Sequence, residues 1–397
     1  MNILFDQTEA QALFINGAAE YAQALFLHML ERKADFPEAR LFSLYSSARS
    51  FSYKALSCDK LEARGVTCVD YNGRTLRSIV EENHIDLLFV TCLQAFCDLP
   101  LGDIRNLPCK VVCVIHDLTD EELGTSHIRL LKYLGHPVRL VRYWLSQTKA
   151  RVLSGSLQRK RRMLEFLQEN DADIVTVSDY TRASIRYNYP QLTNAVHVFY
   201  APEKAVPERK ERIDCPALAE LIESGKNYFL VVSADRLLKN ADTMVRACRR
   251  FIESHPGYAL ATVGHVPSTF PAHVALPRLS ASDLEHAYAH AHALLYPSLF
   301  EGFGYPPLEA MKYGCPVICS NVCSMPAVLE DAPLYFSPVY ETDMFRALER
   351  FAAMPRETLS ARSKVQYAKV KQKQNADLEA LSAQLMDGTF TRKEEKT

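Results

Sequence analysis

The chain has 397 residues, enough for two domains of ordinary size, and 48% of them are hydrophobic and 23% charged, as in globular proteins. A net charge of −1 gives no bulk basicity and argues against a nucleic-acid-binding protein. The eleven cysteines form no C-x-x-C pair, which favours reduced, packed thiols over disulfides or zinc. No apolar run approaches the roughly 20 residues that span a bilayer, and MNILFDQTEA does not resemble a signal peptide. We expect a cytoplasmic protein without a membrane span.

The first half of the chain alternates short apolar segments with polar, helical ones. Strands are expected at 2–5, 39–45, 66–70, 85–90, 110–116, 173–178 and 195–200. The first strand leads through Gly17 into a strongly helical segment, Ala18–Arg32. This order is typical of a doubly wound α/β domain with a parallel sheet.

Two positions in this half suggest a ligand-binding site. Gly17 at a helix start either lets a backbone amide approach a ligand or is a loop glycine without one. His116 and Asp117 follow the buried run 110–115, and ligands bind at the carboxyl ends of strands in open α/β sheets. A histidine there is either catalytic or structural, and the residue alone does not decide.

The segment 123–164 contains ten Lys or Arg residues and no Asp or Glu. Leucines and aromatic residues are interleaved with the basic ones, which predicts one or two basic amphipathic helices. Over residues 128–162 such a face would suit an anionic membrane surface or an anionic acceptor. The alternative is a solvated helix face balanced by acids elsewhere.

Prolines and charges gather after residue 200 and indicate a linker, after which the α/β alternation starts again. We expect an N-terminal domain over 1–203, a linker at 204–215, a C-terminal domain over 216–375 and a helical tail over 376–397 that could pack back on the N-terminal domain. Strands of the second domain are expected at 228–233, 259–263, 293–296 and 316–319, with helices at 243–253 and 281–290.

The second domain carries the clearest ligand-binding pattern. In 294–326, an apolar strand is followed by a glycine-bearing turn, a proline-led helix that ends at Gly314, and another strand. A turn that leads into a helix N-terminus is a ready anion site, and Glu301 and Glu309 frame it. Arg236 and Lys239, on a loop after the strand 228–233, would suit a diphosphate or are a surface pair.

Motifs typical of other enzyme classes are absent from the sequence. Asp171-Ala172-Asp173 precedes a strand, whereas acids that hold a nucleotide-bound metal follow one, so it is interpreted as a helix-to-strand corner. The sequence has no G-x-x-x-x-G-K-[ST] loop, no G-x-G-x-x-G after its first strand, no G-x-S-x-G and no H-E-x-x-H.

The segment EGFGYPPLE, Glu301–Glu309, resembles the E-x₇-E motif of the retaining glycosyltransferases of family 4, also called glycosyl transferases group 1. Tyr296-Pro297-Ser298 before it and Ser324-Met325-Pro326 after it are similar to the motif's usual surroundings, and the resemblance extends over about residues 1–350. It implies the GT-B fold, in which two Rossmann-like domains face each other across a cleft. It also implies retaining, metal-independent sugar transfer from a nucleotide-sugar donor.

The same resemblance implies residue roles on the donor side. Glu309 would accept from the ribose, and Glu301 would lie beside the transferred sugar. Gly302, Phe303 and Gly304 would meet the sugar and the distal phosphate.

Further roles follow for the remaining candidates. Arg236 and Lys239 would bind the diphosphate, although they are three residues apart and the family's pair is commonly about five apart. Gly264 is expected near the donor and His116 near the reaction centre. Gly17 would lie near phosphate and acceptor, in a loop that lacks the usual Gly-x-Gly.

The expected function is the transfer of a hexose, with mannose as first choice, to a glycan or lipid-linked acceptor in cell-surface polysaccharide synthesis. The donor would be GDP-mannose or UDP-glucose, and no cofactor, metal or nucleic acid is expected. The protein would be cytoplasmic, with peripheral contact to the membrane. The alternatives are a catalytically inactive GT-B binding partner and a GT-B nucleotide-sugar epimerase; a phosphorylase of that fold would need a lysine for pyridoxal phosphate and a much longer chain.

Overall fold

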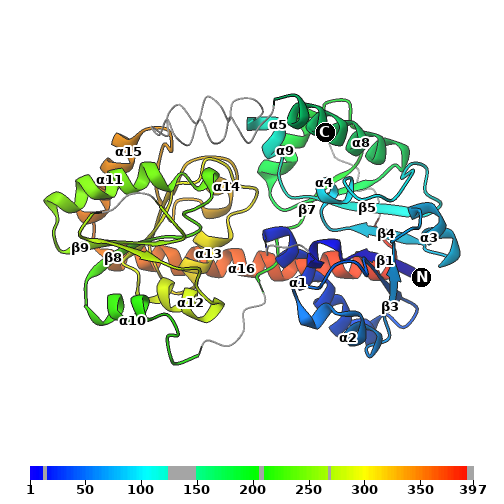
Figure 1. Cartoon of the computed structure of the whole chain (residues 1–397), viewed down its shortest axis with the longest axis horizontal. Coiled ribbons are helices and arrows are strands. Elements are labelled where there is room, and N and C mark those ends of the chain that lie inside the picture. Colours follow the sequence, from blue (N-terminus) through cyan, green and yellow to red (C-terminus); the bar gives the residue numbers. More distant parts are fainter. Residues whose placement is uncertain (12–15, 124–148, 205–209, 267–269, 391–397) are drawn as a thin grey trace. The chain divides into compact units, whose positions relative to one another are not determined.

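The computed structural model of the chain describes residues 1–11, 16–123, 149–204, 210–266 and 270–390. They form two compact units (Figure 1). Unit one contains Met1–Glu122, Leu145–Ala205 and Lys373–Thr397, and unit two is built on Val206–Gln372. The segment 205–209 of the expected linker and residues 128–148 of the expected basic face lie outside the described residues.

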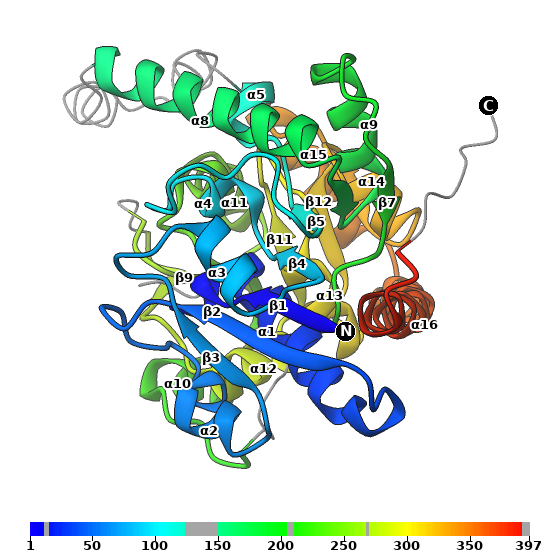
Figure 2. The ribbon, with the colours of Figure 1, turned by 90° about the vertical axis from the view of Figure 1, so that its right-hand side faces the viewer.

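The sheet of unit one has seven strands in the order β3-β2-β1-β4-β5-β6-β7, and Figure 2 shows β3 to β5 rising in that order. All neighbours pair in parallel. The strands are β1 (Asn2–Asp6), β2 (Arg40–Tyr45), β3 (Thr67–Asp70), β4 (Leu87–Val90), β5 (Lys110–Ile115), β6 (Asp173–Thr176) and β7 (Val196–Val198). The chain moves outward from β1 on one side and then returns to β4 on the other, so the topological switch point lies between β1 and β4.

The helices of unit one connect these strands and bury their apolar faces. They are α1 (Gly17–Glu31), α2 (Cys58–Glu62), α3 (Leu76–Glu82), α4 (Leu93–Phe96), α5 (Thr119–Leu123), α8 (Lys149–Glu169) and α9 (Asp179–Asn188), with the 3₁₀ turns η1 (Thr8–Gln11), η2 (Lys33–Asp35) and η3 (Lys54–Leu56). Phe96 of α4 and Phe166 of α8 are buried with ring centroids 5.7 Å apart. The apolar residues of β4 and β5 pack in the same core.

The sheet of unit two has six parallel strands in the order β10-β9-β8-β11-β12-β13. Its strands are β8 (Asn227–Val231), β9 (Tyr258–Val263), β10 (His273–Leu276), β11 (Ala293–Tyr296), β12 (Val317–Ser320) and β13 (Leu334–Phe336). Its helices are α10 (Pro216–Glu223), η5 (Leu237–Lys239), α11 (Ala241–Ser254), α12 (Ala281–His290), α13 (Tyr305–Lys312), α14 (Met325–Leu329) and α15 (Glu341–Ala352). The switch point here lies between β8 and β11.

The two outer strands β10 and β13 were not predicted from the sequence. Each has only three or four residues, and most of them are partly exposed. Apolar runs of three or four residues are too short to be told from loop or helix residues by periodicity.

One long helix, α16 (Arg356–Asp387), closes the described chain (Figure 1). In unit two, its Gln366 donates a hydrogen bond to the backbone oxygen of Val328 at 2.8 Å. In unit one, its Asp377 accepts from the backbone N–H of Tyr200 at 2.7 Å, and its Gln374 donates to the backbone oxygen of Ala201. The two ends of α16 therefore belong to different units.

Candidate functional site

Two loops of unit two meet at the carboxyl edge of its sheet. One follows β8 and the other follows β11, and these strands are hydrogen-bonded neighbours. The backbone N–H of Leu299 donates to the oxygen of Leu238 at 2.8 Å, which joins the loops directly. This edge lies beside the switch point, where ligands bind in doubly wound folds.

At this edge Lys239, Tyr296 and Glu301 form a compact cluster. The Lys239 ammonium is 2.5 Å from Glu301 Oε1 and 2.5 Å from the Tyr296 hydroxyl oxygen, and it lies 4.5 Å from the centre of the Tyr296 ring. The side chains of Lys239 and Glu301 are only 11% and 15% exposed. The structure thus brings together two predicted site residues, and it shows the expected diphosphate-binding lysine in contact with the first acid of the motif.

Tyr296 is a functional candidate that residue patterns did not identify. Its side chain is 1% exposed. Burial, the nearby Glu301 charge and a hydrogen bond with Glu301 raise the pKa of Tyr296 well above its usual value. The phenol therefore stays protonated, and its oxygen accepts from the Lys239 ammonium.

The turn after Glu301 depends on glycine. Gly304 has φ of +98°, and a Cβ built on it would lie 2.2 Å from Met325 Cε. Ser324 Oγ donates to the Glu301 backbone oxygen at 3.0 Å, so residues at the start of α14 hold both ends of the turn. A positive φ and a close neighbour explain why the segment 302–304 requires glycine at its last position.

The turn leads into α13 with Gly304 as N-cap and prolines at the second and third helical positions. Pro306 and Pro307 have no N–H, so the first turn of this helix offers fewer donors than the sequence pattern suggests. The backbone dipole still makes this end of the helix positive. Any anion contact therefore depends on the amides of the turn more than on those of the helix.

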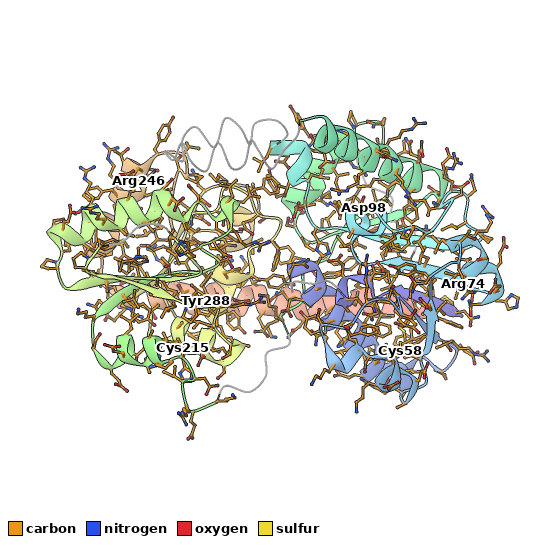
Figure 3. The ribbon with its side chains drawn as sticks, viewed as in Figure 1. Cys58, Arg74, Asp98, Cys215, Arg246 and Tyr288 are labelled. Carbon is orange, nitrogen blue, oxygen red and sulfur yellow. The ribbon has the colours of Figure 1, made fainter. Side chains whose placement is uncertain are left out.

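The second acid of the motif, Glu309, lies within α13. The Tyr288 hydroxyl donates to Glu309 Oε2 at 2.9 Å, and Figure 3 labels Tyr288 on α12. Burial and the Glu309 charge raise the pKa of Tyr288 well above its usual value. Tyr288 is a second residue that sequence analysis missed, because its contact requires α12 and α13 to be adjacent.

The loop after β8 approaches residue 264 closely, which explains why this position is glycine. This glycine follows β9 with φ of +100°, and a Cβ there would lie 2.7 Å from Asp235 Oδ1 and 3.1 Å from the Asp235 backbone nitrogen. The close approach of the two loops thus needs glycine at this position. Arg236 is exposed on the same loop, at the start of η5.

In unit one, His116 follows β5 at the carboxyl edge. Its Nε2 donates to the Thr91 backbone oxygen at 2.8 Å, which makes Nδ1 the acceptor of the neutral ring. Burial lowers the pKa of His116. The Tyr21 ring meets the imidazole edge-on, with centroids 5.1 Å apart.

Sequence analysis missed the buried acid of this edge, Asp6 at the end of β1. Asp6 Oδ1 accepts from the Thr8 backbone N–H at 3.0 Å and from the Thr8 hydroxyl at 2.6 Å. The Thr91 hydroxyl donates to the Asp6 backbone oxygen at 3.2 Å, so Thr91 joins Asp6 to His116. Burial raises the pKa of Asp6 to about 6. An Asp followed two residues later by Thr, directly after an apolar run, is the signal that could have identified it.

Gly17 is exposed at the first position of α1. The side chain of Asn16 caps this helix by accepting from the Ala19 backbone N–H at 2.9 Å, and its amide donates to Glu9 Oε2 at 3.2 Å. Residues 12–15 of the preceding loop lie outside the described residues. The role expected for Gly17 stays a prediction.

The described part of the predicted basic face is helix α8, and its basic run contacts groups of unit one. Arg159 is paired with Asp98 at 2.7 Å, and Arg161 is paired with Glu165 at 2.8 Å. Lys160 lies 4.9 Å from the centre of the Tyr189 ring, and Arg162 donates to the backbone oxygens of residues 99 and 102. Each of the four basic residues 159–162 thus has a partner within unit one, and two of them are paired with acids. None of the helices in the described ranges has the length and apolarity to cross a bilayer.

Known structures share the two-sheet architecture. A glycosyltransferase from Rickettsia africae ESF-5 superposes with a TM-score of 0.61 at 10% identity, over 98% of this chain and 99% of that one. HepE from Anabaena, solved in complex with UDP, superposes with a TM-score of 0.62 at 13% identity, over 96% and 99%. Two parallel doubly wound sheets with this likeness define the GT-B fold, as the sequence predicted.

Sequence relatives identify the second half of the chain. Residues 219–365 match the family model "Glycosyl transferases group 1", so the chain contains a domain of that family and the resemblance is confirmed. The O-antigen chain mannosyltransferase B of Escherichia coli is 31% identical over 182 residues, which are 42% of this chain and 47% of that protein. The chain spans about half the length of the curated relatives that it matches first.

Proposed function

We propose that this protein is a retaining glycosyltransferase that moves a hexose from a nucleotide-sugar donor to a glycan or lipid-linked acceptor. The observation that carries the proposal is the pair Lys239–Glu301, which is 2.5 Å long and nearly buried at the carboxyl edge of unit two. A cation and an acid at one point suit a donor that presents a diphosphate next to a sugar bearing hydroxyls. Glu309, eight positions after Glu301, supplies the acceptor for the ribose.

In the proposed reaction, the bond between the anomeric carbon and the diphosphate oxygen breaks through an oxocarbenium-like state. Arg236, Lys239 and the amides of the segment 302–304 stabilise the negative charge that develops on the diphosphate. Glu301 lies beside the transferred sugar, and Gly264 lets the loop after β8 approach the donor. His116, neutral at physiological pH, contacts the sugar when the donor is bound.

We favour retention by attack of the acceptor on the face that the diphosphate leaves, with a diphosphate oxygen taking the acceptor's proton. This route needs no protein base, since the departing oxygen is already near the incoming hydroxyl. The other route is a covalent glycosyl-enzyme formed on Glu301. Trapping such an adduct by mass spectrometry with a slow donor analogue would contradict the favoured route.

The donor we propose first is GDP-mannose, because the E. coli relative is named a mannosyltransferase. UDP-glucose comes second, since HepE, of the same fold, was solved with UDP. The named role of the relative in O-antigen chains supports an acceptor in cell-surface polysaccharide synthesis. Such an acceptor would be met at the cytoplasmic face of the membrane.

The test is product analysis with the purified chain. GDP-mannose and UDP-glucose are each incubated with the chain and lipid-linked or free glycan acceptors, without added metal, and the anomeric configuration of the product is determined by NMR. Arg236→Ala and Glu309→Ala should abolish most transfer. Arg249→Ala, which removes an exposed arginine paired with Glu253 on α11, should not.

The same experiment separates the alternatives. Conversion of the donor to another nucleotide sugar without acceptor would indicate an epimerase. Nucleotide binding without any product would indicate an inactive binding partner. Full transfer activity in both Arg236→Ala and Glu309→Ala would contradict the site.

A further inference from the structure

Both acids of the E-x₇-E motif share a feature that the motif does not contain. Each is linked to the hydroxyl of a tyrosine that is almost fully buried: Tyr288 donates directly to Glu309, and Tyr296 accepts from Lys239, which also contacts Glu301. The side chains of these tyrosines are 1% and 2% exposed. They come from different elements, β11 and α12, so the arrangement is not a local turn motif.

A third buried tyrosine of unit two bonds a different kind of acceptor. Tyr228 on β8 is 1% exposed, and its hydroxyl donates to the backbone oxygen of Ala287 at 2.7 Å. A backbone oxygen satisfies a buried phenol without placing a charge beside it. Tyr288 instead donates to a carboxylate, and Tyr296 accepts from a lysine that is paired with one.

Such contacts can hold a carboxylate in one orientation. A carboxylate has about four acceptor positions, so it can accept from a phenol and from a ligand at the same time. A glutamate side chain that is already ordered loses less conformational entropy when the ligand arrives. Tyr296 acts on Glu301 through the cation, because its oxygen accepts from Lys239 at 2.5 Å and Lys239 also contacts Glu301.

We propose that Tyr288 and Tyr296 are positioning residues of the donor site, each holding one acid of the motif in its ligand-binding orientation. The inference rests on the proposed function and divides the roles of the two tyrosines. Tyr288 acts through Glu309 and therefore on the affinity for the nucleoside part of the donor. Tyr296 acts through Glu301 and Lys239 and therefore on the sugar and the leaving diphosphate during transfer.

The test removes one tyrosine hydroxyl at a time. Tyr288→Phe and Tyr296→Phe keep the ring and its packing, and Tyr228→Phe is the matched control because it removes an equally buried hydroxyl from the same unit. Each variant is first compared with the wild type by thermal unfolding. Steady-state transfer is then measured with whichever of GDP-mannose and UDP-glucose the wild type uses, and binding of the corresponding nucleoside diphosphate alone is measured by calorimetry.

For Tyr288→Phe, the donor KM and the Kd of the nucleoside diphosphate should both rise about tenfold, with kcat changed less than about twofold, as expected for a lost bond to a charged group. For Tyr296→Phe, kcat should fall about tenfold or more, with a smaller change in the Kd of the diphosphate. Tyr228→Phe should stay within about twofold of the wild type in all three quantities.

The results separate this inference from the proposed function. If the wild type transfers sugar and all three variants have the same KM, kcat and Kd, the positioning role is contradicted and the proposed function is not. The reverse split, with Tyr288→Phe acting on kcat and Tyr296→Phe on affinity alone, would contradict the division of roles. Absence of nucleotide binding and transfer in the wild type would contradict the proposed function and the inference together.

Discussion

The carboxyl edges of the two sheets balance buried charge in different ways. In unit two the acid Glu301 forms an ion pair with Lys239. In unit one the acid Asp6 is fully buried, and its hydrogen-bond partners among the described residues are the hydroxyl and amide groups of Thr8 and Thr91. Its raised pKa of about 6 means that it takes up a proton just below neutral pH.

This difference shows that similar topologies can present different chemistry. The edge of unit two holds a positive charge that can meet a phosphate. The edge of unit one has a neutral imidazole at His116 and a carboxyl group that exchanges a proton near pH 6, which suits hydroxyl-bearing groups better than anions. The comparison predicts separate responses to mutation and to pH.

The largest effect should follow the removal of the cation in unit two. Lys239→Met leaves Glu301 nearly buried without its charge partner, which should cost about 3 kcal/mol of the free energy of unfolding and reduce transfer more than a hundredfold. Urea denaturation of the full chain and steady-state assays measure the two quantities. The control Lys369→Met breaks an exposed pair with Glu330 and should cost less than about 1 kcal/mol. Equal losses of stability and of transfer in both variants would show that the Lys239–Glu301 pair contributes no more than an exposed ion pair.

In unit one, Asp6→Asn should change how stability depends on pH. A carboxyl group whose pKa is about 6 in the folded chain and near 3.8 in the unfolded chain binds its proton more tightly when folded. The wild type therefore loses stability as pH rises from about 4 to about 6, by on the order of 3 kcal/mol, and the variant should not. Urea midpoints at several pH values give this difference.

The control for that experiment is Asp103→Asn. Asp103 is fully exposed, and a hydrogen bond from Arg105 lowers its pKa to about 2. Its variant should therefore follow the wild type between pH 4 and 7. A parallel pH dependence of the wild type and Asp6→Asn would contradict the protonation of Asp6.

A smaller effect is expected from Gly304→Ala. The residue has φ of +98°, where an L-residue is strained by about 1–2 kcal/mol, and the added Cβ would displace the end of Met325. Because the strain lies in the turn between the two acids, transfer should fall further than stability alone predicts. Gly73→Ala, at φ of +72° with no atom within 4 Å of the added Cβ, carries the backbone strain without the collision. It should leave donor KM unchanged.

The smallest effect concerns the cap of α1. Asn16→Ala removes the side chain that accepts from Ala19 and should cost about 1 kcal/mol of stability. Thr75→Ala removes the equivalent cap of α3, where Thr75 accepts from Ser78. If the role expected for Gly17 is correct, only the Asn16 variant should also raise the acceptor KM.

Much of unit two's site could be predicted because its residues are close in sequence. Glycines and prolines around Glu301 have conformational requirements that can be recognised without any partner. The pairing of Lys239 with Glu301 could not be predicted, since it requires β8 and β11 to be neighbours. The same holds for Tyr288, which meets Glu309 only because α12 packs beside α13.

In unit one the sequence identified His116 from its place after an apolar strand, and it missed Asp6. An aspartate after a strand is most often a solvated turn residue, and only the packing of β1 between β2 and β4 makes it buried. The inner strands of both sheets were predicted because each contains a buried apolar run. The outer strands β10 and β13 were not, since their runs have only three or four residues.

The course of α16 has a consequence for synthesis of the chain. Asp377 and Gln374 satisfy the backbone groups of Tyr200 and Ala201, and Phe390 packs edge-on against His197 with centroids 5.0 Å apart. On a ribosome these partners emerge after every residue of unit two. Unit two can therefore reach its final fold while unit one, although begun first, still waits for its last helix. The N-terminal half released alone should accordingly expose the β7 region, including His197 and Phe199, and associate with itself or with chaperones.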